Sequence, residues 1–136
     1  NLNFKDFLNV EHINSNYENQ ILSDIELKKL MNSAFVSIIP ITNSLQPSGQ
    51  SVALQSMAME IPVMITRSDG FWDDDNLIND ENIILLEENN LDIWKNNIEK
   101  LENNSEYRDL LIKNASLSLN KYFNMKTNFE LLNKYF

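Results

Sequence analysis

The chain has 136 residues, of which 43% are hydrophobic, so it is long enough for one domain with a buried core. It has no cysteine, which excludes disulfides, thiolate metal sites and a cysteine nucleophile, and its single histidine excludes any site that needs two imidazoles. The formal net charge of -9 repels nucleic-acid backbones, so no nucleic-acid partner is expected.

The apolar stretches of the sequence are too short to span a bilayer, and no signal peptide is visible. We therefore expect a cytoplasmic protein without a membrane span.

The first element that the residues predict is a short strand over Val10–Ile13. Ser23 and Glu26 then have the spacing of a capping box, in which each side chain bonds to the backbone of the other residue. They predict a helix that ends at about Ser33 and turns its apolar residues inward, namely Ile25, Leu27, Leu30 and Met31. The nearly all-apolar run Phe35–Pro40 is typical of a central parallel strand.

The rest of the chain continues to alternate between helices and strands. The expected elements are a helix over Gly49–Glu60, strands over Pro62–Thr66 and Asn82–Leu86, helices over Leu91–Leu101 and Glu106–Tyr122, and a terminal helix from Thr127. The first of these helices is apolar almost all round, which predicts that it is buried. This order predicts an α/β fold, with a Rossmann-like parallel sheet flanked by helices, in a single domain over residues 1–136. Because few strand–helix units are present, we expect a fragment of a larger protein.

Gly49, Gln50 and Ser51 follow an apolar strand and open the apolar helix. The free N–H groups of a first helical turn and the positive end of the helix dipole suit an anion, so these residues are candidate phosphate ligands. The alternative is a plain helix start with Ser48 as its cap. Gln55 lies one turn after Ser51, about 6 Å away on the same helix face, which matches the reach from a diphosphate to its ribose. The alternative for Gln55 is a core glutamine bonded to the backbone.

Arg67 is the only basic residue between Lys29 and Lys95. It follows a predicted strand, at the same sheet edge as Gly49, where ligands bind in open parallel sheets. We expect it to add positive charge to a phosphate site. The alternative is a surface arginine paired with Asp69 or Asp73, which contributes little.

Asp73–Asp75 could form a metal or phosphoacceptor cluster, but consecutive residues cannot all point at one ion. We interpret this run as a solvated loop and expect no metal site. Phe71 and Trp72 are interpreted as anchors that pin the loop to the core rather than as a platform for a sugar or base.

The ordered motifs from Leu22 to Phe123 resemble the C-terminal domain of family 4 glycosyltransferases, which have the GT-B fold. The central motif is Leu-Gln-Ser-Met-Ala at residues 54–58, where the family usually has Leu-Glu-Ala-Met-Ala. The resemblance runs through Leu22–Leu30, Ala34–Pro40, Pro47–Met59, Pro62–Thr66, Gly70–Asp73, Asn79–Leu86 and the pair Asn114-Ala115.

This resemblance implies a domain that binds the nucleotide-sugar donor of a retaining glycosyltransferase. Such a hexosyltransferase-like enzyme moves a sugar from a nucleotide diphosphate to an acceptor. In the family, loop and helix amides hold the diphosphate, and two glutamates eight positions apart hold the donor sugar and the ribose. Those two positions are Pro47 and Gln55 here. Gln55 is therefore the candidate ribose ligand, and Gln46, which precedes Pro47, is the candidate sugar ligand.

The resemblance also implies parts that this chain lacks. The family places its basic phosphate ligands in an earlier strand–helix unit and its acceptor site in an N-terminal domain. That N-terminal domain of the same protein is therefore an expected partner, and the isolated chain is expected to be inactive. No cofactor and no catalytic acid or base is implied, and the donor sugar, base, acceptor and oligomeric state stay open.

Two other functions fit the residues. A degenerate glycosyltransferase-like module could serve only as a binding surface, because both family glutamates are replaced. A flavodoxin-like receiver domain could use Asp73–Asp75, but it would need an acidic group after its first strand, where only Glu11 is available.

Overall fold

The computed structural model describes residues 22–124 and 126. The strand expected over Val10–Ile13 and the helix expected from Thr127 lie outside the described residues. The chain divides into two compact units, Asn1–Ser33 and Ala34–Phe136. Among the described residues, no helix is long and apolar enough to cross a membrane.

The described part of the first unit is the helix α1, Asp24–Asn32. Its predicted capping box is confirmed: the Ser23 hydroxyl accepts a hydrogen bond from the Glu26 N–H at 3.3 Å, and the Ser23 N–H donates to Glu26 Oε2 at 2.8 Å. The predicted inward face is wrong, since no residue of α1 is buried and Ile25 is 69% exposed. The described part of this unit has no second element against which that face could pack.

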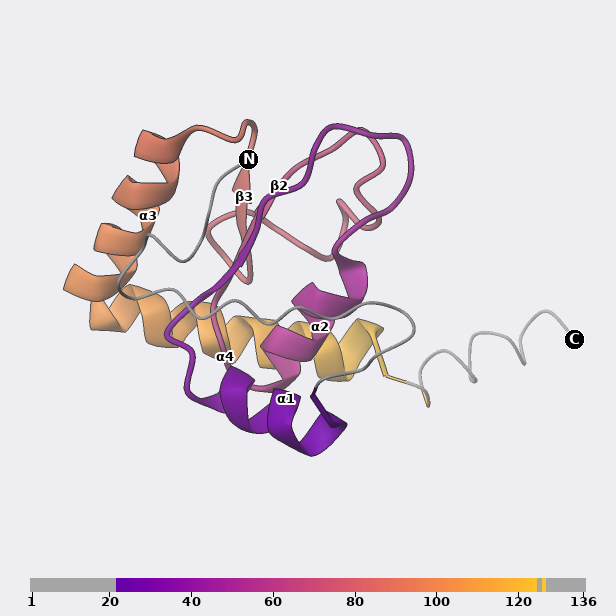
Figure 1. Ribbon diagram of the computed structural model, residues 1–136, viewed down its shortest axis with the longest axis vertical. Coiled ribbons are helices and arrows are strands. Elements are labelled where there is room, and N and C mark those ends of the chain that lie inside the picture. The colour runs from indigo at the N-terminus through magenta and orange to yellow at the C-terminus, as the bar shows by residue number, and fades with distance from the viewer. Residues whose placement is uncertain (1–21, 125, 127–136) are drawn as a thin grey trace, which may run out of the picture. The chain divides into compact units, whose positions relative to one another are not determined.

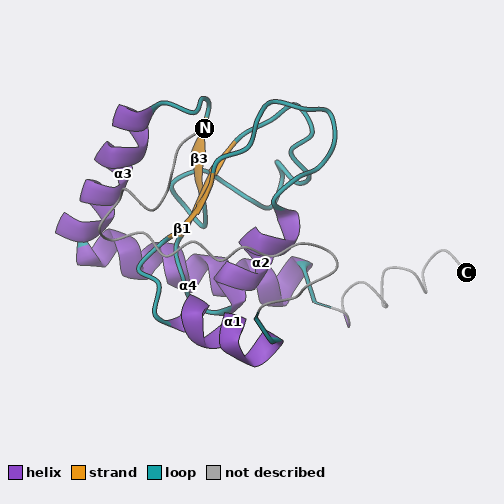
Figure 2. Ribbon diagram, in the orientation of Figure 1, coloured by secondary structure: helices purple, strands orange, loops and turns teal. Residues whose placement is uncertain are grey.

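The second unit contains a parallel sheet of three strands, in the order β1-β2-β3 (Figure 2). Its strands are β1 (Ser37–Ile39), β2 (Val63–Thr66) and β3 (Ile84–Leu86). Each lies inside a predicted apolar run, so the predicted parallel sheet is confirmed. The register sets Ile39 beside Ile65, and Ile65 beside Leu85.

Successive side chains of a strand point to opposite faces, so the sheet has two apolar faces. One face packs with α2 (Gln50–Ala58) and the later part of α4 (Ser105–Tyr122); this cluster consists of Ile39, Ala53, Met57, Val63, Ile65, Leu77, Ile83, Leu85 and Ala115. The other packs with α3 (Leu91–Asn103) and the beginning of α4, in a cluster of Met64, Ile84, Leu86, Trp94, Leu101 and Leu111. Helices therefore flank the sheet, as predicted (Figure 1). The strand predicted to be central, β1, lies at an edge of the described sheet, and its Ile38 is 45% exposed, whereas β2 and β3 are fully buried.

The prediction that α2 is buried is confirmed for one face of the helix only. Its buried residues are Ala53, Ser56 and Met57, whereas Val52 is 47% exposed. The helix packs on the sheet and on α4 with one face only, so its apolar composition does not translate into full burial.

Candidate functional site

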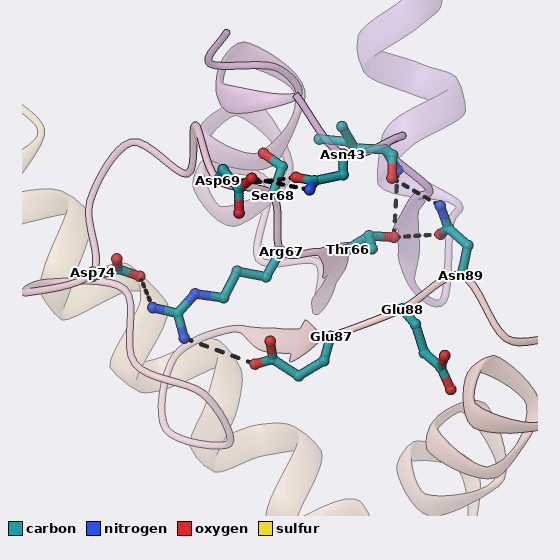
Figure 3. A pocket seen from close by; sticks show the side chains of 10 residues that line it. Asn43, Thr66, Arg67, Ser68, Asp69, Asp74, Glu87, Glu88 and Asn89 are labelled. Carbon is teal, nitrogen blue, oxygen red and sulfur yellow. Dashed lines mark hydrogen bonds and ion pairs between the residues drawn. The ribbon is translucent and has the colours of Figure 1, made fainter. Parts of the chain in front are cut away.

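A polar pocket lies at the carboxyl ends of the three strands (Figure 3). Its volume is about 490 Å³. The pocket is lined by Ile41 and Asn43 after β1, by Thr66–Asp69 at the end of β2, by Glu87–Asn89 after β3, and by Asp74. We call this site the strand-end pocket. It occupies the sheet edge where open parallel sheets bind ligands.

A buried threonine ties the three strand ends together. The Thr66 hydroxyl donates a hydrogen bond to Asn89 Oδ1 and accepts one from the Ile41 N–H at 3.4 Å. The Asn89 amide completes the ring by donating to the Ile41 carbonyl at 2.8 Å. Thr66 is 5% exposed, so this network fixes the floor of the strand-end pocket from within the protein.

Arg67 lines the pocket, but its charge is engaged by carboxylates. The guanidinium forms an ion pair with Asp74 at 2.7 Å and a longer one with Glu87 at 3.8 Å. Its partners are therefore Asp74 and Glu87, in place of the Asp69 or Asp73 that the sequence suggested. Asp69 instead accepts a hydrogen bond from the Asn43 amide at 3.1 Å and donates its backbone N–H to Asn43 Oδ1 at 2.9 Å.

The Ser68 hydroxyl is a polar group of the pocket lining that no other described residue engages. Ser68 is 8% exposed, and its hydroxyl has no hydrogen-bond partner within residues 22–124. Among the described residues, the one buried side-chain polar atom without a partner is Trp72 Nε1, so solvent reaches the Ser68 hydroxyl and water can be its partner.

The first turn of α2 has the geometry of an open helix start. Gly49 is its N-cap with φ of 77°, and no side chain caps the first turn. The suggested Ser48 cap is therefore not formed; the Ser48 hydroxyl donates to the Gln46 carbonyl at 3.4 Å. Gln50 and Ser51 are exposed.

Gly49 is also required by packing. A Cβ at this position would lie 2.8 Å from Ile41 Cδ1 and 2.9 Å from Ile39 Cγ2. The turn therefore needs both the positive φ that glycine tolerates and the space that a side chain would fill.

The structure brings only one of the six predicted ligand residues into the strand-end pocket, namely Arg67. Gly49, Gln50, Ser51, Gln46 and Gln55 lie outside its lining, on α2 and on the loop that precedes it. Gln55 is exposed, so the alternative of a core glutamine is wrong.

The Asp73–Asp75 run is divided among separate roles. Asp73 accepts hydrogen bonds from the backbone and side-chain amides of Asn76 at 3.0 Å, Asp74 binds Arg67, and Asp75 is exposed. Among the described residues, no group of three His, Cys, Asp or Glu side chains could hold a metal ion.

The aromatic residues before this run pack against the core. Phe71 and Trp72 contact the apolar cluster on the α2 side of the sheet, and their ring centroids lie 4.5 Å apart. Their predicted role as anchors of the loop is confirmed.

Sequence reasoning missed most of the residues that line the strand-end pocket: Asn43, Thr66, Ser68, Asp69, Asp74, Glu87, Glu88 and Asn89. A signal for them was present, because most follow directly after one of the three apolar strands. The carboxyl ends of parallel strands meet at one edge, so polar residues after each strand gather there.

No protein-family model and no curated protein sequence matches the chain. Among solved structures, the fold is similar to the C-terminal domain of a glycosyl transferase group 1 family protein, LpcC, from Francisella tularensis. The TM-score is 0.64 and the sequence identity is 19%, over 79% of this chain and 52% of that chain. This chain therefore spans about half the length of that neighbour. The similarity confirms the predicted α/β fold.

Proposed function

We propose that this chain is the donor-binding C-terminal domain of a retaining, GT-B-fold glycosyltransferase of family 4, with a nucleotide diphosphate sugar as its donor. The observation that carries the proposal is the uncapped first turn of α2, which begins after Gly49, in a fold similar to the C-terminal domain of a group 1 glycosyl transferase. The ordered motifs of the sequence support the same family. The acceptor would bind to an N-terminal domain of the same cytoplasmic protein, so the isolated chain should not turn over donor.

The first turn of α2 is the proposed diphosphate site. Its amides have no side-chain cap, and residues 30–59 contain no charged side chain that would oppose an anion. Backbone N–H groups and the helix dipole can stabilise a phosphate without a lysine or arginine. Gln55, one turn further along the same helix, is the proposed ribose ligand, and Gln46 of the preceding loop is the proposed sugar contact.

Arg67 has a different place in this proposal from the one that the sequence suggested. A phosphate would have to compete with Asp74 and Glu87 for its guanidinium. We therefore assign Arg67 to holding these carboxylates in position and leave the phosphate charge to the amides of residues 49–51.

Amide chemical-shift mapping of the 136-residue chain with UDP, GDP and ADP tests the proposal. The largest shifts are expected at residues 49–52, and Gln55→Ala should weaken binding. Asn96→Ala, an exposed amide change on α3, is the matched control and should leave affinity unchanged. Largest shifts at residues 73–75 would contradict the phosphate assignment.

The second candidate is a degenerate module that no longer binds donor. It is favoured by the replacement of both family glutamates and by the ion pairs that engage Arg67, the only basic residue in the lining of the strand-end pocket. The same titration separates the two candidates, because the degenerate module should show no saturable shifts with any of the three nucleotides.

A further inference from the structure

We propose that Asn43, Asp69 and Gly70 are positioning residues, which hold the loop between β1 and α2 against the loop after β2. We call their contacts the loop lock. Through the loop, the lock sets the position of the first turn of α2. The inference rests on the proposed donor-binding function and deepens it, because it names residues outside the proposed phosphate site that control the geometry of that site.

The loop between β1 and α2 is fixed at both ends. Ile41 belongs to the hydrogen-bond network in the floor of the strand-end pocket, and Gly49 packs against isoleucines of the sheet. Between these ends, the hydrogen bonds that residues 42–48 make to other parts of the described chain all go to Asp69 and Gly70. Asp69 and Gly70 therefore determine where the middle of the loop lies.

Asn43 and Asp69 form the side-chain part of the loop lock (Figure 3). The Asn43 amide donates to Asp69 Oδ2 at 3.1 Å, and Asn43 Oδ1 accepts a hydrogen bond from the Asp69 N–H at 2.9 Å. One amide group thus donates and accepts at the same time, which fixes its orientation as well as its distance. Because one of the two bonds goes to the backbone, the pair ties Asn43 to the main chain of the loop after β2.

Gly70 brings the backbones of the two loops close together. Its N–H donates to the Ser44 carbonyl at 2.8 Å. A Cβ at this position would lie 2.5 Å from the carbonyl carbon and oxygen of Leu45 and 2.9 Å from the carbonyl carbon of Gln46. Backbone atoms cannot rotate away as the end of a side chain does, so any other residue here must push one loop aside.

The loop after β2 is the firmer of the two. Phe71 and Trp72 follow Gly70 directly and pack against the apolar core. In the other loop, Leu45 is 83% exposed. A side chain at position 70 should therefore displace the loop between β1 and α2. The displacement should reach the first turn of α2, because only two residues separate Gln46 from the residue that begins this turn.

The first measurement follows amide chemical shifts of the ¹⁵N-labelled 136-residue chain without a ligand. In Gly70→Ala, direct contact alters the shifts of residues 44–46 in any case. The loop lock predicts that the change continues into residues 49–51. Ile84→Val, which removes a methyl group from the apolar cluster on the α3 side of the sheet, is the control for lost stability and should leave residues 49–51 unmoved. Thermal unfolding verifies that each variant is folded.

The second measurement is the affinity for UDP, GDP and ADP. Gly70→Ala should bind the preferred nucleotide about 10-fold more weakly, which corresponds to the loss of one charge-assisted amide contact. Ile84→Val should bind it as tightly as the wild-type chain does. Neither variant changes a proposed phosphate ligand, so weaker binding reports the position of those ligands.

A second series of variants tests the side-chain part of the loop lock and decides the question if Gly70→Ala does not fold. Asn43→Ala removes both hydrogen bonds without a change in charge, so it should alter the shifts of residues 49–51 and weaken nucleotide binding about 3-fold. Asn96→Ala on α3 is the matched control. Asp69→Asn and Asp69→Ala remove the same charge, but only Asp69→Asn keeps an acceptor for Asn43. Asp69→Asn should therefore preserve the wild-type shifts at residues 49–51, and Asp69→Ala should not.

The outcomes separate the loop lock from the proposed function. Altered shifts at residues 49–51 together with weaker nucleotide binding would support both. Altered shifts there in variants of a chain whose wild type binds no nucleotide would support the loop lock and overturn the donor function. Nucleotide binding that the variants leave unchanged, with shifts that end at residue 47, would overturn the loop lock and leave the donor function standing. Equal shifts in Asp69→Asn and Asp69→Ala would overturn the place of Asp69 in the lock.

Discussion

The first turn of α2 and the strand-end pocket are both built where the strands end, but they are held in place by different forces. The α2 turn depends on shape: Gly49 packs against Ile39, Ile41 and Ile65, and residues 30–59 carry no charge. The pocket depends on polar contacts, namely the Thr66 network below and the ion pairs of Arg67 at its rim. Two neighbouring regions of one small sheet are therefore stabilised in different ways, one by close apolar packing and the other by hydrogen bonds and ion pairs.

The same comparison predicts how the two regions respond to substitution. Changes to the glycine turn should cost the most stability, because close packing leaves no room for relaxation. Changes to exposed charges should cost the least, because water screens them.

The largest effect is expected for Gly49→Ala. The new Cβ would meet Ile41 Cδ1 at 2.8 Å in a backbone with φ of 77°. Left-handed strain and overpacking together should lower the free energy of unfolding by about 2–4 kcal/mol. Urea denaturation measures the loss, and Ser51→Ala in the same turn is the control. A loss below about 1 kcal/mol would show that the isoleucines move aside easily.

Thr66→Val should have the next largest effect. It replaces a hydroxyl that bonds to Asn89 and Ile41 with a methyl group of similar size. The unfolding free energy should fall by about 1–2 kcal/mol, because Asn89 Oδ1 loses its donor. Thr66→Ser keeps the hydroxyl and should recover the hydrogen-bonding part of this loss. If both variants lose the same amount, the threonine methyl rather than the network is what stabilises the strand ends.

Asp80, Lys100 and Tyr107 form an ion-pair cluster outside both regions, with which the exposed ion pairs of Arg67 can be compared. Asp80 accepts hydrogen bonds from Lys100 at 2.8 Å and from the Tyr107 hydroxyl, and Lys100 lies over the Tyr107 ring. Partial burial on its own would raise the pKa of Asp80. The hydrogen bonds from Lys100 and Tyr107, together with the charge of Lys100, outweigh burial and lower that pKa below 3.8. Burial and the adjacent Asp80 carboxylate raise the pKa of Tyr107.

A lowered carboxyl pKa stabilises the fold above the unfolded pKa, and this contribution is lost as the pH falls through the folded pKa. Asp80→Asn should therefore lower the free energy of unfolding by about 0.5–1 kcal/mol at pH 7. This loss should become progressively smaller as the pH falls toward the pKa of Asp80. Asparagine tolerates the left-handed backbone at this position, where φ is 59°. Urea denaturation of both proteins from pH 7 to about pH 3 measures the difference. A difference that does not change with pH would contradict the electrostatic interpretation.

Arg67→Ala should have the smallest effect on stability. The side chains of Arg67, Asp74 and Glu87 are 41%, 55% and 79% exposed, so the loss should be below about 0.5 kcal/mol. The affinity for a nucleoside diphosphate should change by less than about twofold, since the amides of α2 carry the phosphate in our proposal. Lys95→Ala, which breaks an exposed pair on α3, is the control. A tenfold loss of affinity for the nucleoside diphosphate would indicate that Arg67 binds the phosphate after all.

Local features of the fold could be predicted from the sequence because they are written in short stretches. The capping box of α1 requires only Ser23 and Glu26. Each strand lies within an apolar run that is visible in the sequence. The parallel sheet followed from the alternation of these runs with helices. The importance of Gly49 was also visible, because it stands between a strand and an apolar helix.

Tertiary structure alone decided which polar residues meet. Asn89 donates a hydrogen bond to Ile41, which is 48 positions away in the sequence. Arg67 forms ion pairs with Asp74 and Glu87, although Asp69 is nearer to it in the sequence. No local pattern encodes these pairings, because they depend on the strand register and on the path of each loop. The burial of apolar faces is decided in the same way, as the exposed residues of α1 and the exposed side of α2 demonstrate. Sequence periodicity determines which side chains share a face, whereas whether that face is covered depends on what packs against it.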